Sequence, residues 1–449
     1  MAEQFGPKAG AALNSDRRTV LKALGLAGAV CPFGERAFAA SSAKPPQSGH
    51  VTDAPVANAA SADDRVPVYG PHQAGVVTAR PANGMIASFD VVAEAPDDLE
   101  RLFRNLTARI VFLAHGGPVE ETDPRLPPPD SGIVGPIVRP DALTVTLSLG
   151  AALFEERPWL KPLKPKRLVR MTRFQNDALD RHICHGDLTL QICANTQDTT
   201  IHALRDIIKT CAGQLVLKWK QEGNVPVIMP GPDGVVESAR NFLGFRDGSA
   251  NPNAGDEALM NRLVWAGADR GEPAWAVGGS YQAVRIIRNF VERWDRTPLG
   301  EQERIMGRVK MSGAPLDRRA DSEFKVPDFA NDPEGKITPL DAHIRLANPR
   351  TEETRDSLIL RRPFNYSNGV TKSGQLDQGL LFICYQADIE RGFITVQRRL
   401  DGEPLEEYIK PVGGGFFYTL PGIRDTSDYL GSSLIVAARA HASSHPAPG

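Results

Sequence analysis

The chain has 449 residues, 41% of them hydrophobic and 24% charged, a composition typical of globular proteins. Its formal net charge of −2 argues against a nucleic-acid or membrane-surface partner, because both require a basic excess. After residue 40, no apolar run reaches the roughly 20 residues that a membrane-spanning helix needs, so the mature chain is expected to lack a membrane span.

The first forty residues (1–40) predict a twin-arginine signal peptide. Arg17 and Arg18 precede an apolar stretch at residues 23–32, and a small-x-small cleavage site follows at residues 37–39. This order of a basic, an apolar and a small-residue region is typical of a segment removed during export. The protein is therefore expected to be periplasmic or otherwise exported, by a route that carries folded proteins and suits one that loads a cofactor first.

The mature chain begins with a predicted flexible leader at residues 41–65, rich in Ala, Ser and Pro. Beyond it, apolar alternation predicts strands and helical spacing predicts helices, in the same order twice. The first half has predicted strands at 84–93, 143–154, 187–194 and 214–220 and predicted helices at 96–107 and 200–211. The second half has predicted strands at 279–290 and 379–386 and predicted helices at 300–308 and 389–400.

Two strand–helix–strand sets in each half predict an α+β fold of two ferredoxin-like domains, with antiparallel sheets and helices. We expect these domains at residues 66–245 and 246–440. A stretch with six prolines, residues 122–140, predicts a long loop that covers a surface.

The cysteines are too few and too scattered to predict a disulfide framework. After the signal peptide there are four, Cys184, Cys193, Cys211 and Cys384. We expect buried free thiols, with one bridge among the four as the alternative.

Three segments contain residues suited to chemistry. Asp247 lies between two glycines in residues 244–248, where the backbone can turn tightly and approach a ligand. His343 lies in residues 341–350, between arginines and before an Asn-Pro break, and Arg361 ends the apolar run 358–361. Taken singly, each has a plain alternative: a solvated turn, a structural histidine and a solvated strand end.

Together and in this order, the three segments resemble the DyP-type (dye-decolourising) haem peroxidases. More narrowly, they resemble the exported branch of EfeB-type deferrochelatase/peroxidases. Further similar segments are residues 69–75, 186–188, 241–245, 296–303 and 379–382. The resemblance covers roughly residues 66–440, and it implies a fold of the dimeric α+β barrel-like superfamily.

The resemblance implies a haem b cofactor with His343 as the axial ligand of the iron. It implies Asp247 and Arg361 as the catalytic pair that acts on H2O2, which then oxidises a dye-like or phenolic reductant. The chemistry suits these residue types, because splitting peroxide requires a proton to move between its two oxygens. It also requires a fixed positive charge while negative charge develops on the departing oxygen.

The resemblance also implies further haem contacts. Arg350 is expected to pair with a haem propionate, since arginine binds carboxylates with two hydrogen bonds. The other expected contacts are Gly248, Ser249, Ala250, Asn348, Pro349 and Arg361. A histidine ligand usually donates its second ring proton to a carboxylate or carbonyl, and Asp388 and Glu390 are the candidates. Both are also explained as charges at the start of a helix.

Two other functions remain open. One is a deferrochelatase that releases iron from haem within an iron-uptake system containing a permease. The other is a haem carrier without turnover, which has no need of Asp247 and Arg361. A homo-oligomer also remains an open alternative.

Overall fold

The computed structural model describes residues 61–232 and 234–444. The predicted signal peptide and most of the predicted leader therefore lie outside the described residues. Within the described part of the chain, no helix has both the length and the apolar character needed to cross a bilayer. Cys184, Cys193, Cys211 and Cys384 are buried free thiols, as predicted.

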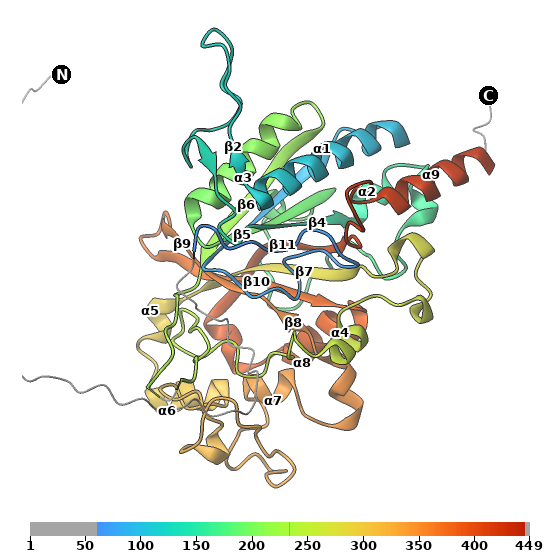
Figure 1. Ribbon diagram of the computed structural model, residues 1–449. Helices are drawn as coiled ribbons and strands as arrows, with labels where there is room; N and C mark the ends of the chain where they lie inside the picture. Colours follow the sequence, from blue (N-terminus) through green and yellow to red (C-terminus); the bar gives the residue numbers. More distant parts are fainter. Residues whose placement is uncertain (1–60, 233, 445–449) are drawn as a thin grey trace, which may run out of the picture. The chain divides into compact units, whose positions relative to one another are not determined.

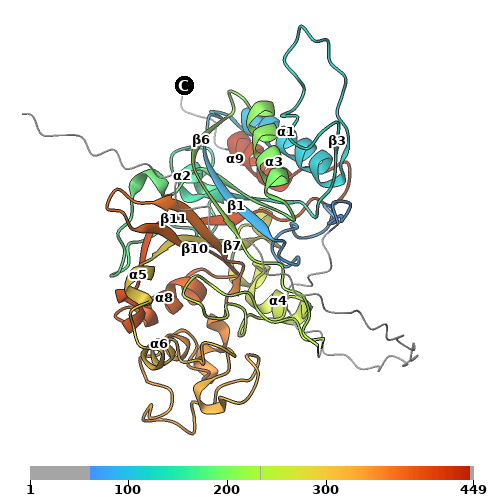
Figure 2. The same cartoon turned by 90° about the vertical axis from the view of Figure 1, so that its left-hand side faces the viewer.

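The central feature is a sheet of nine strands that closes on itself (Figures 1 and 2). The order is β7-β11-β4-β5-β1-β6-β9-β10-β8, and β10 also pairs with β7. The pairings are antiparallel throughout this sheet. The strands are β1 Asn83–Val91, β4 Thr144–Gly150, β5 Leu188–Ala194, β6 Leu215–Asn224, β7 Ser280–Asn289, β8 Leu360–Arg361, β9 Phe364–Val370, β10 Leu376–Gln386 and β11 Ile409–Thr419.

The two halves of the chain repeat one strand order. The first half contributes β4-β5-β1-β6 and the second contributes β9-β10-β7-β11. In each set, the second, third, first and fourth of these strands along the chain lie side by side in that order. This is the ferredoxin-like arrangement that the sequence predicts. The halves meet where β11 pairs with β4 and where Asn224 of β6 pairs with Asn365 of β9. The domain boundary between residues 245 and 246 stays a prediction.

Helices cover the outer surface of each half (Figure 1). Over the first half lie α1 Pro96–His115, α3 Gln197–Thr210 and α9 Ser432–Ser444. Around the second half lie α4 Glu257–Leu263, α5 Val291–Trp294, α6 Leu299–Met306, α7 His343–Ala347 and α8 Thr395–Leu400. Helix α1 shows why such a segment is predictable, because it begins with proline and two aspartates and ends before Gly116, at φ 72°.

The predicted loop at residues 122–140 leaves a short strand, β2 Gly117–Pro118, and includes the strand that pairs with it, β3 Ile137–Val138. The predicted strand at 143–154 is too long, because β4 ends at Gly150 and α2 Ala151–Glu155 begins there.

Strand β11 is absent from the predicted elements because proline and glycine normally argue against a central strand. Here a register shift between Pro411 and Gly413 accommodates the proline. Gly414 has φ 120°, and a Cβ there would lie 2.0 Å from the carbonyl oxygen of Val284. These residues let β11 pack closely against β7 while it joins the two halves.

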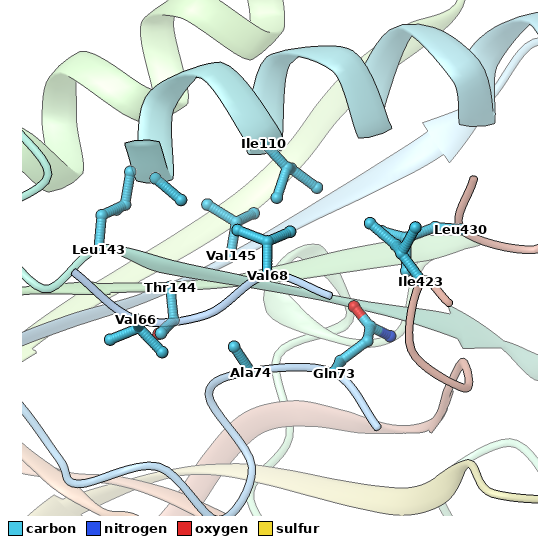
Figure 3. Close-up of a pocket in the computed structure, with 11 residues that line it drawn as sticks. Val66, Val68, Gln73, Ala74, Ile110, Leu143, Thr144, Val145, Ile423 and Leu430 are labelled. Carbon is cyan, nitrogen blue, oxygen red and sulfur yellow. The ribbon is translucent and has the colours of Figure 1, made fainter. Parts of the chain in front are cut away.

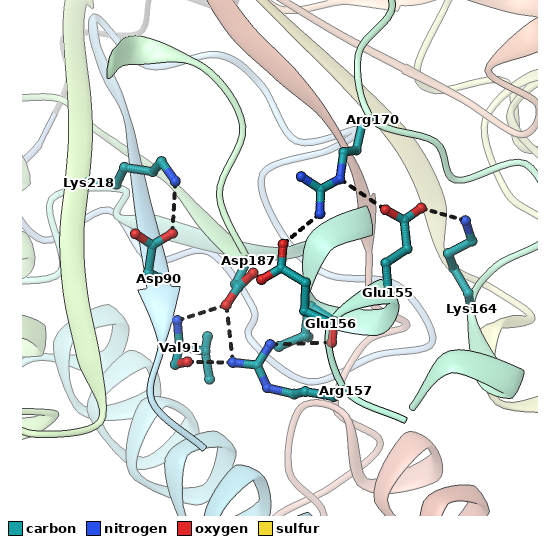
Figure 4. A network of polar contacts seen from close by, with 10 residues as sticks. Asp90, Val91, Glu155, Glu156, Arg157, Lys164, Arg170, Asp187 and Lys218 are labelled. Carbon is teal, nitrogen blue, oxygen red and sulfur yellow. Dashed lines mark hydrogen bonds and ion pairs between the residues drawn. The ribbon is translucent and has the colours of Figure 1, made fainter. Parts of the chain in front are cut away.

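A polar network fixes the entry to β5 in the first half (Figure 4). The backbone N–H of Asp187 donates to Phe89, and its carboxylate accepts from the backbone N–H of Val91 at 3.1 Å and from Arg157 at 3.2 Å. Burial raises the pKa of Asp187 against the opposing effect of these bonds. The network binds the loop to β1, so its role is structural.

Candidate functional site

A large cavity lies against the outer face of the second-half strands. Its empty volume, counted to the solvent mouth, is about 1700 Å³. Strands β7, β10 and β11 form one wall, and α6, α7 and α8 contribute the others. The apolar side chains of this lining include Ile287, Leu380, Phe382, Ile409, Met306, Ile344, Val396 and Leu400.

A second, much smaller cavity lies beneath α1 in the first half (Figure 3). Its lining is almost entirely apolar. The amide of Gln73, one of its two polar side chains, already bonds to the backbone of Leu147 and Leu420. This cavity therefore offers no arrangement of polar groups for a reaction.

The three segments singled out in the sequence converge on the large cavity. Asp247, His343 and Arg361 all line it, although 114 residues separate the first from the last. Arg361 Nη1 donates to Asp247 Oδ1 at 3.1 Å, and the two side chains are 26% and 15% exposed. An acid–base group and a fixed cation thus lie in contact at a place that solvent and small molecules reach.

His343, the first residue of α7, is held by a buried carboxylate. Its Nδ1 lies 2.7 Å from Oε2 of Glu403, whose side chain is 3% exposed. Burial lowers the pKa of His343, but the charge and hydrogen bond of Glu403 outweigh burial and leave that pKa raised. The contact fixes the ring and leaves Nε2 as the nitrogen available to a ligand.

The predicted partners of His343, Asp388 and Glu390, are wrong. The carboxylate of Asp388 accepts from Arg167 Nε at 2.8 Å and from the backbone N–H groups of Glu390 and Arg391. Glu390 pairs with Arg398 at the surface, at 3.2 Å. Glu403 takes the place expected of them, but it lies sixty residues from His343, and no local sequence pattern marks it.

Most of the predicted cofactor contacts line the cavity. Those that do are Gly248, Ser249, Ala250, Asn348, Arg350 and Arg361. Pro349 is not among the described lining residues. Arg350 has φ 62°, and the non-helical turn places the residues on either side of the proline, but not the proline itself, at the wall.

Two further cations line the cavity that the sequence did not single out, Arg246 and Arg308. Arg308 is 5% exposed and donates to the backbone carbonyls of Gly313 and Glu323. Burial, with Arg350 nearby, lowers the pKa of Arg308 to about 10. Within the described part of the chain, neither Arg308 nor Arg350 forms an ion pair, so both can receive anionic groups of a ligand.

These features fit a haem group. A large apolar cavity suits the porphyrin, a histidine with one nitrogen fixed suits the iron, and two cations without ion pairs suit the carboxylates. The contact between Asp247 and Arg361 adds the acid–base group and the positive charge that peroxide chemistry requires.

Comparisons with known proteins point the same way. The models of the N-terminal and C-terminal domains of Dyp-type peroxidases match residues 73–224 and 238–424. The Deferrochelatase of Escherichia coli (strain K12) is 55% identical over 423 residues, which are 93% of this chain and 96% of that protein. The Deferrochelatase of Shigella sonnei (strain Ss046) matches to the same extent.

Solved structures of similar proteins cover most of the chain. A DyP-type peroxidase from Cellulomonas bogoriensis is 34% identical, covers 83% of this chain and 99% of its own, and superposes with a TM-score of 0.73. Ferric DtpA from Streptomyces lividans is 31% identical, covers 85% of this chain and all of its own, and superposes with a TM-score of 0.75.

Proposed function

Because the chain belongs to the DyP-type peroxidase family and is therefore a haem-dependent peroxidase that uses H2O2 to oxidise a reductant, we propose that His343, Asp247 and Arg361 carry this reaction. The observation that supports the proposal is their convergence on one cavity, with Arg361 bonded to Asp247 and His343 backed by Glu403.

Each side chain has a distinct role. Haem b, when bound, supplies the redox-active iron. His343 would hold the iron through Nε2 while its Nδ1–H donates a hydrogen bond to Glu403, and Arg308 and Arg350 would pair with the carboxylates of the haem. Asp247 accepts a proton from one oxygen of the peroxide and returns it to the other. Arg361 stabilises the negative charge that develops on the departing oxygen.

The visible spectrum of the purified protein, before and after one equivalent of H2O2, tests the proposal. We expect a Soret band that shifts after peroxide is added and returns when a phenolic or dye-like reductant follows. A protein that shows no Soret band after incubation with haem b, or whose band does not respond to peroxide, contradicts it.

A second candidate function is release of iron from haem within an iron-uptake system. It is favoured by the name of relatives that match 93% of this chain, Deferrochelatase. Incubation of the haem-loaded protein with a reductant should then yield iron-free porphyrin, detected by its fluorescence, in proportion to the iron recovered. Porphyrin that keeps its iron, or that is cleaved, contradicts this candidate. A permease partner and a homo-oligomer stay predictions.

Replacing Glu403 tests the support of His343. The variant Glu403→Ala should bind haem about 10- to 100-fold more weakly, the usual cost of losing the carboxylate behind a ligating histidine. Haem titration of the haem-free protein, followed at the Soret band, measures the affinity. Glu407→Ala is the matched control, because this glutamate of the same turn is exposed and pairs with Arg293 at the surface. Equal haem affinities in the two variants would contradict the proposal that Glu403 supports His343.

The twin-arginine prediction is tested by changing Arg17 and Arg18 to lysine together. We expect the protein to stay in the cytoplasm, since the paired guanidinium groups are the recognised part of the signal. Fractionation with immunodetection measures the distribution. Normal amounts in the periplasm contradict the prediction and leave the export route open.

A further inference from the structure

The backbone of Arg361 belongs to a strand that is paired on one side only. Strand β8 has two residues, and its register partners in β10 are Cys384 and Tyr385. Arg362 N–H donates to Ile383 of β10 at 2.8 Å. Because successive residues of a strand direct their backbone groups to opposite sides, the N–H and C=O of Arg361 point away from β10. An edge of this kind needs other partners.

The side chain of Asn251 supplies both partners. Its Oδ1 accepts from Arg361 N–H at 2.8 Å, and its Nδ2 donates to the carbonyl oxygen of Arg361 at 3.1 Å. A carboxamide carries a donor and an acceptor side by side, as a peptide group does. Asn251 therefore acts as a one-residue replacement for the missing neighbouring strand.

Asn251 also belongs to the turn that carries Asp247. Its own N–H donates to the carbonyl oxygen of Gly248 at 3.0 Å, and Asp247 N–H donates to Ala239 at 2.9 Å. The turn and strand β8 are thus joined twice, once through the Asn251 carboxamide and once through the bond from Arg361 to Asp247. The carboxamide contact fixes the backbone from which the Arg361 side chain extends.

We infer that Asn251 is a positioning residue of the peroxide site, which sets the place of the Arg361 guanidinium relative to Asp247 without lining the cavity itself. The inference rests on the roles proposed above for Asp247 and Arg361. Catalytic groups lose efficiency steeply when misplaced, and an error of 1 Å costs on the order of 100-fold in rate.

The first measurement is the rate of reaction of the haem-loaded protein with peroxide, by stopped flow, in a double-mutant cycle. Asn251→Ala should slow the reaction by about 10- to 100-fold in the wild-type background. In the Arg361→Leu background the same change should have less than about a threefold effect, because contributions made through a shared residue do not add. Asn253→Ala is the matched control, since the side chain of this asparagine of the same loop accepts from Gly255 N–H and forms no hydrogen bond with Arg361 among the described residues.

The second measurement does not depend on turnover. Fluoride bound to ferric haem accepts hydrogen bonds from nearby donors, so its dissociation constant reports where the guanidinium lies. The dissociation constant of fluoride should rise about tenfold in Asn251→Ala, because a tenfold change is about what the loss of one charge-assisted hydrogen bond costs. It should stay unchanged in Asn253→Ala. Asn251→Asp keeps the acceptor for Arg361 N–H and should give an intermediate value. It carries the same tests if the alanine variant fails to load haem.

The outcomes distinguish the positioning role of Asn251 from the catalytic role of Arg361. If Asn251→Ala slows the reaction equally in both backgrounds, or leaves fluoride binding at the wild-type value, Asn251 is a general structural residue and the inference is wrong. If Arg361→Leu alone has no effect on the rate, the proposed catalytic role of Arg361 fails, and this inference fails with it.

Discussion

Replacing His343 with alanine should yield a protein that lacks a Soret band and is exported poorly. The only bond proposed between chain and iron passes through this side chain, and the arginines that receive the carboxylates cannot replace it. Haem content per protein, from the pyridine haemochrome assay, measures the effect. Normal haem content in His343→Ala would overturn the assignment of the ligand.

The loss must be separated from general damage. His202→Ala is a suitable control, because this histidine on α3 is 1% exposed, bonds to Ser131 and is not among the residues that line the cavity. We expect that variant to be less stable yet to bind haem normally. Added imidazole should restore part of the Soret band in His343→Ala, since it can occupy the space of the missing ring. Haem loss in both variants, without rescue, would indicate unfolding.

Several parts of the fold follow from local pattern in the sequence. Strand β5 alternates apolar and polar residues along its sequence, although all seven of its residues are buried, and α1 carries its own start and stop residues. The repeat of these elements in two halves leads directly to two ferredoxin-like units. Strand β11 could not be predicted from the sequence, because its proline and glycines make sense only once the close approach of β7 is known.

The candidate site, like the fold, was only partly predictable from the sequence. Asp247, His343 and Arg361 each lie in an unremarkable segment, and only their order along the chain, through resemblance, assigns them to one cavity. The residues that hold these three in place cannot be identified from the sequence alone. Glu403 supports His343 from sixty residues away, and Asn251 holds the backbone of Arg361 from 110 residues away. These pairings are set by tertiary packing and leave no local periodicity.

The division of labour between Asp247 and Arg361 gives the last prediction. Arg361→Leu should slow the second-order reaction with peroxide by about 100- to 1000-fold, the usual cost of losing a preorganised donor at a developing charge. Asp247→Asn should slow it as well, within the roughly 100- to 10,000-fold range of acid–base groups. Stopped flow on both variants, with haem occupancy measured first, gives the comparison. Arg355→Leu and Asp356→Asn, exposed positions outside the cavity lining, control for loss of charge alone.

We expect the arginine variant to be the slower of the two. The Asp247 and Arg361 side chains are 15% and 26% exposed in a cavity that opens to solvent, so water can enter and relay a proton when the carboxylate is gone. Water cannot supply a fixed positive charge in the same place. If Asp247→Asn proves slower, this ranking is wrong, although the site stands. If neither variant is slowed about tenfold, far below the usual losses for such groups, the catalytic roles proposed for this pair fail, and binding of haem without turnover becomes the better account of the cavity.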